Sequence, residues 1–126
     1  MCEGVYKVNK TLILCGDENA ENIDLRNMGI TSVRADAFIN STMLIKLNLQ
    51  MNNVTEIPLN FLSNSTLLSI LLLDYNFINT IPGNFLENNT ALSYLTLNNN
   101  NISGLLPNFL VKHHQLATLR LNDNIL

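Results

Sequence analysis

Two cysteines and six glycosylation motifs are the residues of this 126-residue chain that could carry covalent chemistry. Cys2 and Cys15 flank two short runs of β-branched and apolar residues, which are separated by Asn9-Lys10. Such runs on either side of a polar break predict a β-hairpin, and pairing across its turn would bring the two sulfurs together. We therefore expect a disulfide that closes an N-terminal cap over residues 1–19. The alternative is a pair of free, buried thiols in a reducing compartment.

The N-x-S/T motif, which accepts N-linked carbohydrate, occurs at Asn9, Asn40, Asn53, Asn64, Asn88 and Asn101. The chain holds 22 Asn and 16 Ser and Thr, so roughly three such motifs would arise by chance placement. Asn40, Asn64 and Asn88 are also spaced by 24 residues. We expect an extracellular glycoprotein, either secreted or a cell-surface ectodomain. The alternative is that duplication copied an Asn that carries no glycan.

The other polar residues form no catalytic or metal-binding pattern. His113 and His114 are neighbours, and because adjacent side chains rarely converge on one ligand, both are expected on the surface. The acidic run at 17–21 lacks the central Gly of a calcium loop, and Met28 stands where its bidentate Glu should be. The chain has no G-x-S-x-G, phosphate-loop or H-E-x-x-H motif. We therefore expect no enzyme activity, no metal and no cofactor.

Charge and hydropathy exclude two further classes. The net charge is −3 and no basic run occurs, so nucleic-acid binding, which needs a positive stripe, is not expected. The longest apolar run, 67–73, is interrupted by Ser69, whereas a membrane span needs about 20 apolar residues. No signal peptide follows Met1, so we expect a mature fragment of a longer ectodomain.

The elements that would position these residues come from a 24-residue repeat, L-x-x-L-x-L-x-x-N-x-L, which occurs at 44–67, 68–91, 92–115 and, in part, 116–126. A degenerate copy at 20–43 has Met28 in place of the Asn, and terminal repeats are expected to be atypical. Because side chains alternate along a strand, Leu47 and Leu49 should point inward while Lys46 and Asn48 point outward. The recurring asparagines, which we call the ladder asparagines, should satisfy buried backbone groups at the end of each strand. They are Asn52, Asn76, Asn100 and Asn124.

Over residues 20–126 this repeat resembles the 24-residue "typical" form of the leucine-rich repeat superfamily. The segments Ile57-Pro58-x-x-Phe61 and Ile81-Pro82-x-x-Phe85 match the second half of that form. The resemblance implies an α/β-type solenoid with short parallel strands on a concave face, irregular or short helical turns on a convex face, and a cysteine-containing N-terminal cap. Toll-like receptor ectodomains and secreted leucine-rich immune proteins of insects have this form.

Outward strand positions and the position before each ladder asparagine form the expected ligand-binding face. Its large apolar members cluster in the repeat 68–91, and such patches often mark an interface. The candidate contact residues are Lys46, Asn48, Met51, Ile70, Leu72, Asp74, Tyr75, Tyr94, Thr96 and Arg120. We expect an extracellular recognition module, with innate immune recognition as one setting, that binds a protein or microbial ligand or another leucine-rich repeat chain. The alternatives are an adhesion or structural assembly protein and an intracellular interaction scaffold.

Overall fold

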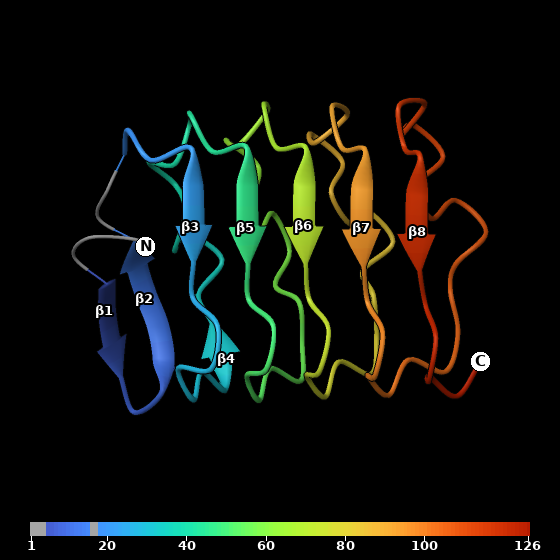
Figure 1. The fold of residues 1–126 in the computed structure, drawn as a ribbon, viewed down its shortest axis with the longest axis horizontal. Helices are drawn as coiled ribbons and strands as arrows, with labels where there is room; N and C mark the ends of the chain where they lie inside the picture. Colours follow the sequence, from blue (N-terminus) through green and yellow to red (C-terminus); the bar gives the residue numbers. More distant parts are fainter. Residues whose placement is uncertain (1–4, 16–17) are drawn as a thin grey trace.

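The computed structural model describes residues 5–15 and 18–126. Its main sheet has five short parallel strands in the order β3-β5-β6-β7-β8, and a smaller sheet has the order β1-β2-β4. In Figure 1 the strands of the main sheet lie side by side and run in one direction. The strands in chain order are β1 (Val5–Val8), β2 (Thr11–Cys15), β3 (Asn22–Asp24), β4 (Ser32–Val33), β5 (Lys46–Asn48), β6 (Ile70–Leu72), β7 (Tyr94–Thr96) and β8 (Thr118–Arg120).

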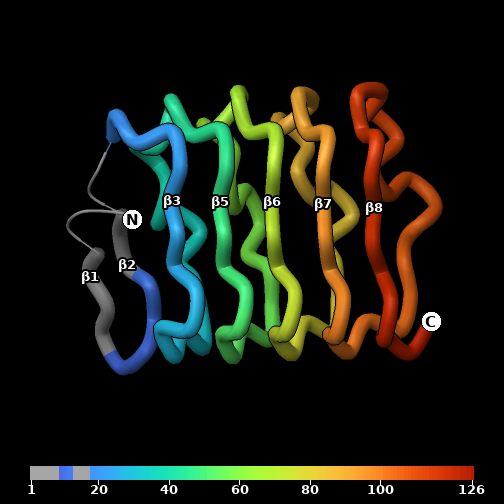
Figure 2. The backbone as a smooth tube through the Cα atoms, viewed as in Figure 1, coloured from blue at the N-terminus to red at the C-terminus, as the bar shows by residue number. Residues whose placement is uncertain are grey.

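Strand register follows the repeat length in every pair of the main sheet. Leu47 lies opposite Leu71, and Leu71 lies opposite Leu95, so that each step is 24 residues. All three side chains are fully buried. The degenerate copy continues the same register, because Ile23 lies opposite Leu47 and is also fully buried. The predicted solenoid with a parallel sheet is confirmed, and successive coils stack as Figure 2 shows.

The side of the solenoid opposite the main sheet, here called the turn face, contains turns and no helix among the residues described. Its backbone bonds join residues three apart, as in Ala37 N–H to Arg34 O (3.1 Å) and Ser63 N–H to Asn60 O (3.2 Å). Asn60, Leu86 and Leu110 each have a φ near +58°. In these three segments the left-handed residue stops a right-handed helix from propagating. Of the irregular or short helical turns expected here, the described residues have the irregular kind, and the helices implied by the α/β class are not found among them.

The N-terminal hairpin extends the turn face. β1 pairs antiparallel with β2 around Asn9 and Lys10, whose positive φ values of 50° and 65° suit a two-residue hairpin turn. β2 then pairs in parallel with β4 of the first coil, and Leu12 is fully buried in the core. The hairpin thus covers the start of the solenoid. The expected Cys2–Cys15 disulfide lies outside the described residues.

One continuous apolar core fills the space between the main sheet and the turn face. The turn face contributes Phe61 and Phe85, both buried. Their rings contact neighbouring coils, with Phe38 and Phe61 edge to face at 5.8 Å and Phe85 and Phe109 stacked at 6.2 Å between centroids. Each coil therefore depends on its neighbours for its packing, which is the expected behaviour of a repeat solenoid.

Candidate functional site

The ladder asparagines connect each coil to the one before it. Asn76 Oδ1 accepts the Val54 N–H at 3.0 Å, and its Nδ2 donates to the Leu49 carbonyl at 3.0 Å. Asn52, Asn100 and Asn124 make the equivalent contacts in their own coils. The amides of Asn52, Asn76 and Asn100 are buried. They hold the end of each strand in a fixed position and so define the surface beside it.

The outer side of the main sheet, here called the strand face, forms an open depression. Asp74 is one of the residues that line it, and the others are Lys46, Gln50, Ile70, Leu72, Tyr94, Thr96, Asn98 and Arg120. Asp74 is only 6% exposed. Its carboxylate accepts hydrogen bonds from Thr96 Oγ1 at 2.6 Å, from the Asn98 N–H at 2.7 Å and from the side-chain amide Nε2 of Gln50.

Three of the predicted contact residues therefore bond within the chain. Asp74 joins β5, β6 and β7 through the hydrogen bonds above, and Thr96 is buried with it. Asn48 is also buried and accepts the Gln50 N–H at 3.0 Å. Their outward register places them on the strand face, but neighbouring side chains cover them. They form a polar floor between the more exposed residues.

Apolar side chains rise from this floor, mainly from the coil that contains β6. Ile70, Leu72 and Tyr94 are half-buried in the depression. Beyond the end of β6, Tyr75 is 58% exposed and Phe77 is 51% exposed. Met51, in the preceding coil, is 48% exposed. We call these residues the apolar surface: Met51, Ile70, Leu72, Tyr75, Phe77 and Tyr94. Sequence reasoning missed Phe77, although its apolar type at a position held by Asn53 and Asn101 was a usable signal.

Met51 and Tyr75 have a backbone conformation that their side chains do not favour. The position before each ladder asparagine has positive φ, with 58° at Met51 and 57° at Tyr75. In the other coils this position holds Asn27, Asn99 or Asp123, residue types that tolerate the left-handed conformation. For Met or Tyr the conformation costs roughly 1 kcal/mol or more. Met51 and Tyr75 lie on adjacent coils, and both project large apolar groups into solvent.

Charged residues lie at both ends of the strand face. At the N-terminal end Arg26 Nη2 contacts Asp24 Oδ2 at 2.9 Å. This hydrogen-bonded pair lowers the pKa of Asp24, chiefly through the side-chain hydrogen bond from Arg26. Lys46 and Arg120 border the central depression on either side of Asp74. A partner of the strand face would meet an apolar centre between cationic side chains.

A second polar column runs through the turn face and was not predicted. Ser41, Ser65, Asn89 and His113 are spaced by 24 residues and all are buried. Ser65 Oγ donates to Ser41 O at 2.8 Å, and Asn89 Nδ2 donates to Ser65 O at 2.7 Å. The regular spacing of four polar residues was the available signal in the sequence.

His113 corrects a specific expectation, since it is 8% exposed and not a surface residue. Its Nε2 lies 2.8 Å from the Leu86 carbonyl oxygen, so Nε2 carries the proton and donates. His114 is exposed, as expected. His113 therefore continues the column of turn-face hydrogen bonds into the last complete coil.

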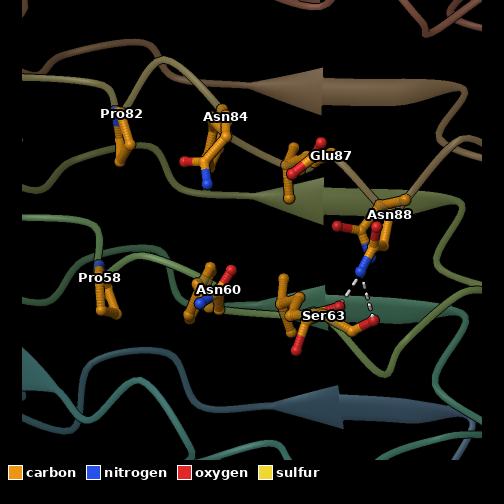
Figure 3. A pocket seen from close by; sticks show the side chains of 12 residues that line it. Pro58, Asn60, Ser63, Pro82, Asn84, Glu87 and Asn88 are labelled. Atoms are coloured by element: carbon orange, nitrogen blue, oxygen red, sulfur yellow. Dashed lines mark hydrogen bonds between the residues drawn. The ribbon is translucent and has the colours of Figure 1, made fainter.

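All six asparagines of the glycosylation motifs are exposed. Two of them nevertheless bond to the preceding coil. Asn64 Nδ2 donates to the Ile39 carbonyl at 2.8 Å. Asn88 Nδ2 donates to the Ser63 carbonyl at 3.2 Å, and Figure 3 shows the Asn88 side chain directed at Ser63. The motifs therefore differ in what their amide nitrogens do in the folded chain.

Within residues 5–15 and 18–126, no three His, Cys, Asp or Glu side chains are grouped closely enough to hold a metal ion. That same part of the chain contains no helix of the length and hydropathy needed to cross a bilayer.

Comparison with known proteins places the fold. No family model matches the sequence, and no curated protein matches it. The crystal structure of the APL1 leucine-rich repeat domain is similar, with a TM-score of 0.83 and 24% identity over 85% of this chain and 28% of that chain. The crystal structure of the LRIM1/APL1C complex gives a TM-score of 0.83 and 24% identity over 85% of this chain and 20% of that chain.

A third similar structure is the leucine-rich repeat ectodomain of the receptor kinase SOBIR1 from Arabidopsis thaliana. It gives a TM-score of 0.53 and 23% identity over 80% of this chain and 67% of that chain. The chain described here has the leucine-rich repeat fold. It spans about a third or less of the length of the APL1 chains that it matches.

Proposed function

We propose that this chain is the recognition part of an extracellular protein and binds a protein partner through the strand face. The observation that carries the proposal is Tyr75, a large exposed side chain held at a φ of 57° at a repeat position where three of the other coils have Asn27, Asn99 or Asp123. Strained residues persist where the surrounding structure fixes them, and they cluster at functional sites. Aromatic side chains ringed by polar groups are also the usual makeup of an interface hot spot.

The apolar surface supports a macromolecular partner more than a small ligand. Its residues spread over three coils and reach past the strand end to Phe77. The depression beneath is open and has no enclosed cavity in which a small molecule could be desolvated. Large, contiguous apolar patches on a soluble fold mark protein contact sites. One of the similar structures is itself a complex of LRIM1 with APL1C, which favours a protein partner.

The extracellular placement is supported by the exposed glycosylation motifs and by the similarity to a receptor kinase ectodomain. Innate immune recognition is the setting implied by the sequence resemblance. A microbial ligand would use the same surface, and binding of the purified chain to intact bacterial or fungal cells tests for it. If the Tyr75→Asn variant described below binds such cells as well as the unmodified chain does, the strand face is not the microbial site.

The experiment compares the tagged chain with Tyr75→Asn and Leu72→Thr in capture from the extracellular fluid of the source organism. Asn and Thr already occupy the equivalent positions in other coils, at Asn99 and Thr96, so both variants should fold. We expect Tyr75→Asn to raise the free energy of unfolding by about 0.5 kcal/mol and to lose a secreted partner that the unmodified chain retains. Val111→Asn, at an exposed position of the turn face, is the matched control.

If the same proteins are captured by all three variants, the strand face does not carry the binding. If Tyr75→Asn is more stable but binds the same proteins, the proposal is also contradicted, because the strained backbone at Tyr75 would then serve no binding role. Met51→Asn repeats the comparison at the neighbouring strained position, with the same expected direction for stability and binding.

A further inference from the structure

The five glycosylation motifs outside the hairpin fall into two columns of the solenoid, and the two columns differ in structure. Asn53 and Asn101 lie where the chain leaves the main sheet, at the same repeat position as Phe77. Asn40, Asn64 and Asn88 occupy successive coils beside the buried polar column of Ser41, Ser65, Asn89 and His113. The two columns differ in the surroundings of the side-chain amide nitrogen, Nδ2.

At two of the three sites in the second column, Asn64 and Asn88, the nitrogen that would bear a sugar already holds two coils together. Asn64 Nδ2 donates to Ile39 O, and Asn88 Nδ2 donates to Ser63 O, each reaching back 25 residues. The next residue in each motif is buried and bonded as well, since Ser65 Oγ donates to Ser41 O and Asn89 Nδ2 donates to Leu62 O. These motifs therefore belong to a seam of hydrogen bonds between adjacent coils.

N-glycosylation replaces one hydrogen of Nδ2 with a sugar ring. At Asn64 the ring would begin at a nitrogen only 2.8 Å from the carbonyl of the preceding coil, and the one remaining N–H would have to keep that bond while the ring fits beside it. Three such rings at Asn40, Asn64 and Asn88 would also be stacked at the spacing of adjacent coils, roughly 5 Å. That distance is about the width of one ring, so the sugars would crowd one another.

The first column has neither obstacle. The backbone at each of its two sites is fixed, because the Asn53 N–H donates to Ile30 O and the Asn101 N–H donates to Ile78 O. The two side chains are exposed and make no hydrogen bond within the described residues. The sites are two coils apart, with Phe77 between them, which leaves roughly 10 Å between the sugars.

We propose that Asn53 and Asn101 carry N-linked glycans, whereas Asn64 and Asn88 are structural amides that stay unmodified in the folded protein. This proposal rests on the extracellular placement proposed above. Glycans are attached before the chain has folded. Chains that carry a sugar at Asn64 or Asn88 should fold poorly, so few of them should be among the molecules that leave the cell. The two glycans lie on the coils either side of Phe77, past the strand ends, and leave the strand residues of the apolar surface, Ile70, Leu72 and Tyr94, open to a partner.

The test has two arms. In the first, the chain is secreted from insect cells, and the occupancy of each site is measured by mass spectrometry after enzymatic glycan removal in ¹⁸O-labelled water. Asn53 and Asn101 should be occupied in most molecules, and Asn64 and Asn88 in a small minority. Equal occupancy of the two columns would overturn the proposal.

The second arm uses unglycosylated protein from bacteria and Asn→Asp substitutions, which keep the side-chain shape but remove the donor. Asn64→Asp and Asn88→Asp should each lower Tm by about 3 °C. The matched controls Asn53→Asp and Asn101→Asp should shift Tm by about 1 °C or less. Equal shifts in both pairs would overturn the structural role of the second column.

Carbohydrate at none of the six sites would overturn the glycan assignment. The binding role of the strand face is measured separately with Tyr75→Asn, so its failure is distinguishable from the failure of this inference.

Discussion

Thr96 Oγ1 donates a 2.6 Å hydrogen bond to the carboxylate of Asp74, which lies on the neighbouring coil. Both residues are buried, although both face outward from the main sheet. The carboxylate also accepts the Asn98 N–H at 2.7 Å, so its negative charge is spread over several donors. A charged acceptor that loses a buried donor is costly, because the lost bond is not replaced by water.

Thr96→Val should therefore lower the free energy of unfolding by about 2 kcal/mol, because it keeps the side-chain shape and removes the donor to Asp74. Urea unfolding followed by circular dichroism measures the change. Thr118→Val is the control, since Thr118 is at the edge strand β8 and is partly exposed, and should change stability by about 0.5 kcal/mol or less. Equal effects of the two substitutions would show that the Asp74 network contributes nothing to the sheet.

Replacement of a ladder asparagine should be more costly in the middle of the solenoid than in its last coil. Asn76→Ala leaves the Val54 N–H and the Leu49 carbonyl without their partner in a buried site. We expect a loss of about 3 kcal/mol. Asn124 makes the same contacts but is only partly buried, so water can replace its amide, and Asn124→Ala should cost about 1 kcal/mol. Denaturant titrations of the two variants give the comparison, and a reversed order would contradict the burial argument.

The sequence was sufficient to predict the sheet, because its positions repeat with a single period. Leu47, Leu71 and Leu95 align in the sequence and also lie opposite one another in the sheet. The degenerate first copy could be placed as well, since Ile23 keeps the apolar type at the same position. A leucine that points inward can only lie in the apolar core, so its residue type and its repeat position together predict where it lies.

The turn face could not be predicted in the same way. Its hydrogen bonds join residues three apart, and the left-handed residue at Asn60, Leu86 or Leu110 has no required side-chain type. The repeat pattern therefore leaves irregular and short helical turns as alternatives, and the described residues have the irregular kind. On the strand face the side-chain contacts could not be predicted. Alternation predicts that Asp74 and Thr96 point outward, but it cannot show that they hydrogen-bond to each other across adjacent coils.

Acid should weaken the contact between Asp24 and Arg26. The hydrogen bond from Arg26 lowers the pKa of the Asp24 carboxyl, so the pair stabilises the folded state above the ordinary carboxyl pKa. This contribution is lost as the pH falls through the lower, folded-state pKa, below about pH 4. Because both side chains are about half exposed, the contribution is small.

Carboxyl NMR titration of the Arg26→Gln variant measures this contact directly. The pKa of Asp24 should rise toward its ordinary value when the guanidinium is removed. Arg34→Gln, which removes a different exposed ion pair with Asp36, is the control and should leave the pKa of Asp24 where it is. A pKa of Asp24 that stays low in Arg26→Gln would show that another group is responsible.

Substitution of the two adjacent histidines should change the free energy of unfolding by very different amounts. His113 is buried and donates from Nε2 to Leu86 O at 2.8 Å, whereas His114 is exposed. His113→Ala removes the bond and leaves a cavity, so it should cost about 2 kcal/mol. His113→Asn should cost less, because Asn89 at the same repeat position bonds to two carbonyls of the preceding coil through its amide. His114→Ala should change stability by about 0.5 kcal/mol or less. Thermal unfolding of the three variants at neutral pH gives the order, and a cost for His114→Ala equal to that of His113→Ala would remove the argument for a buried polar column.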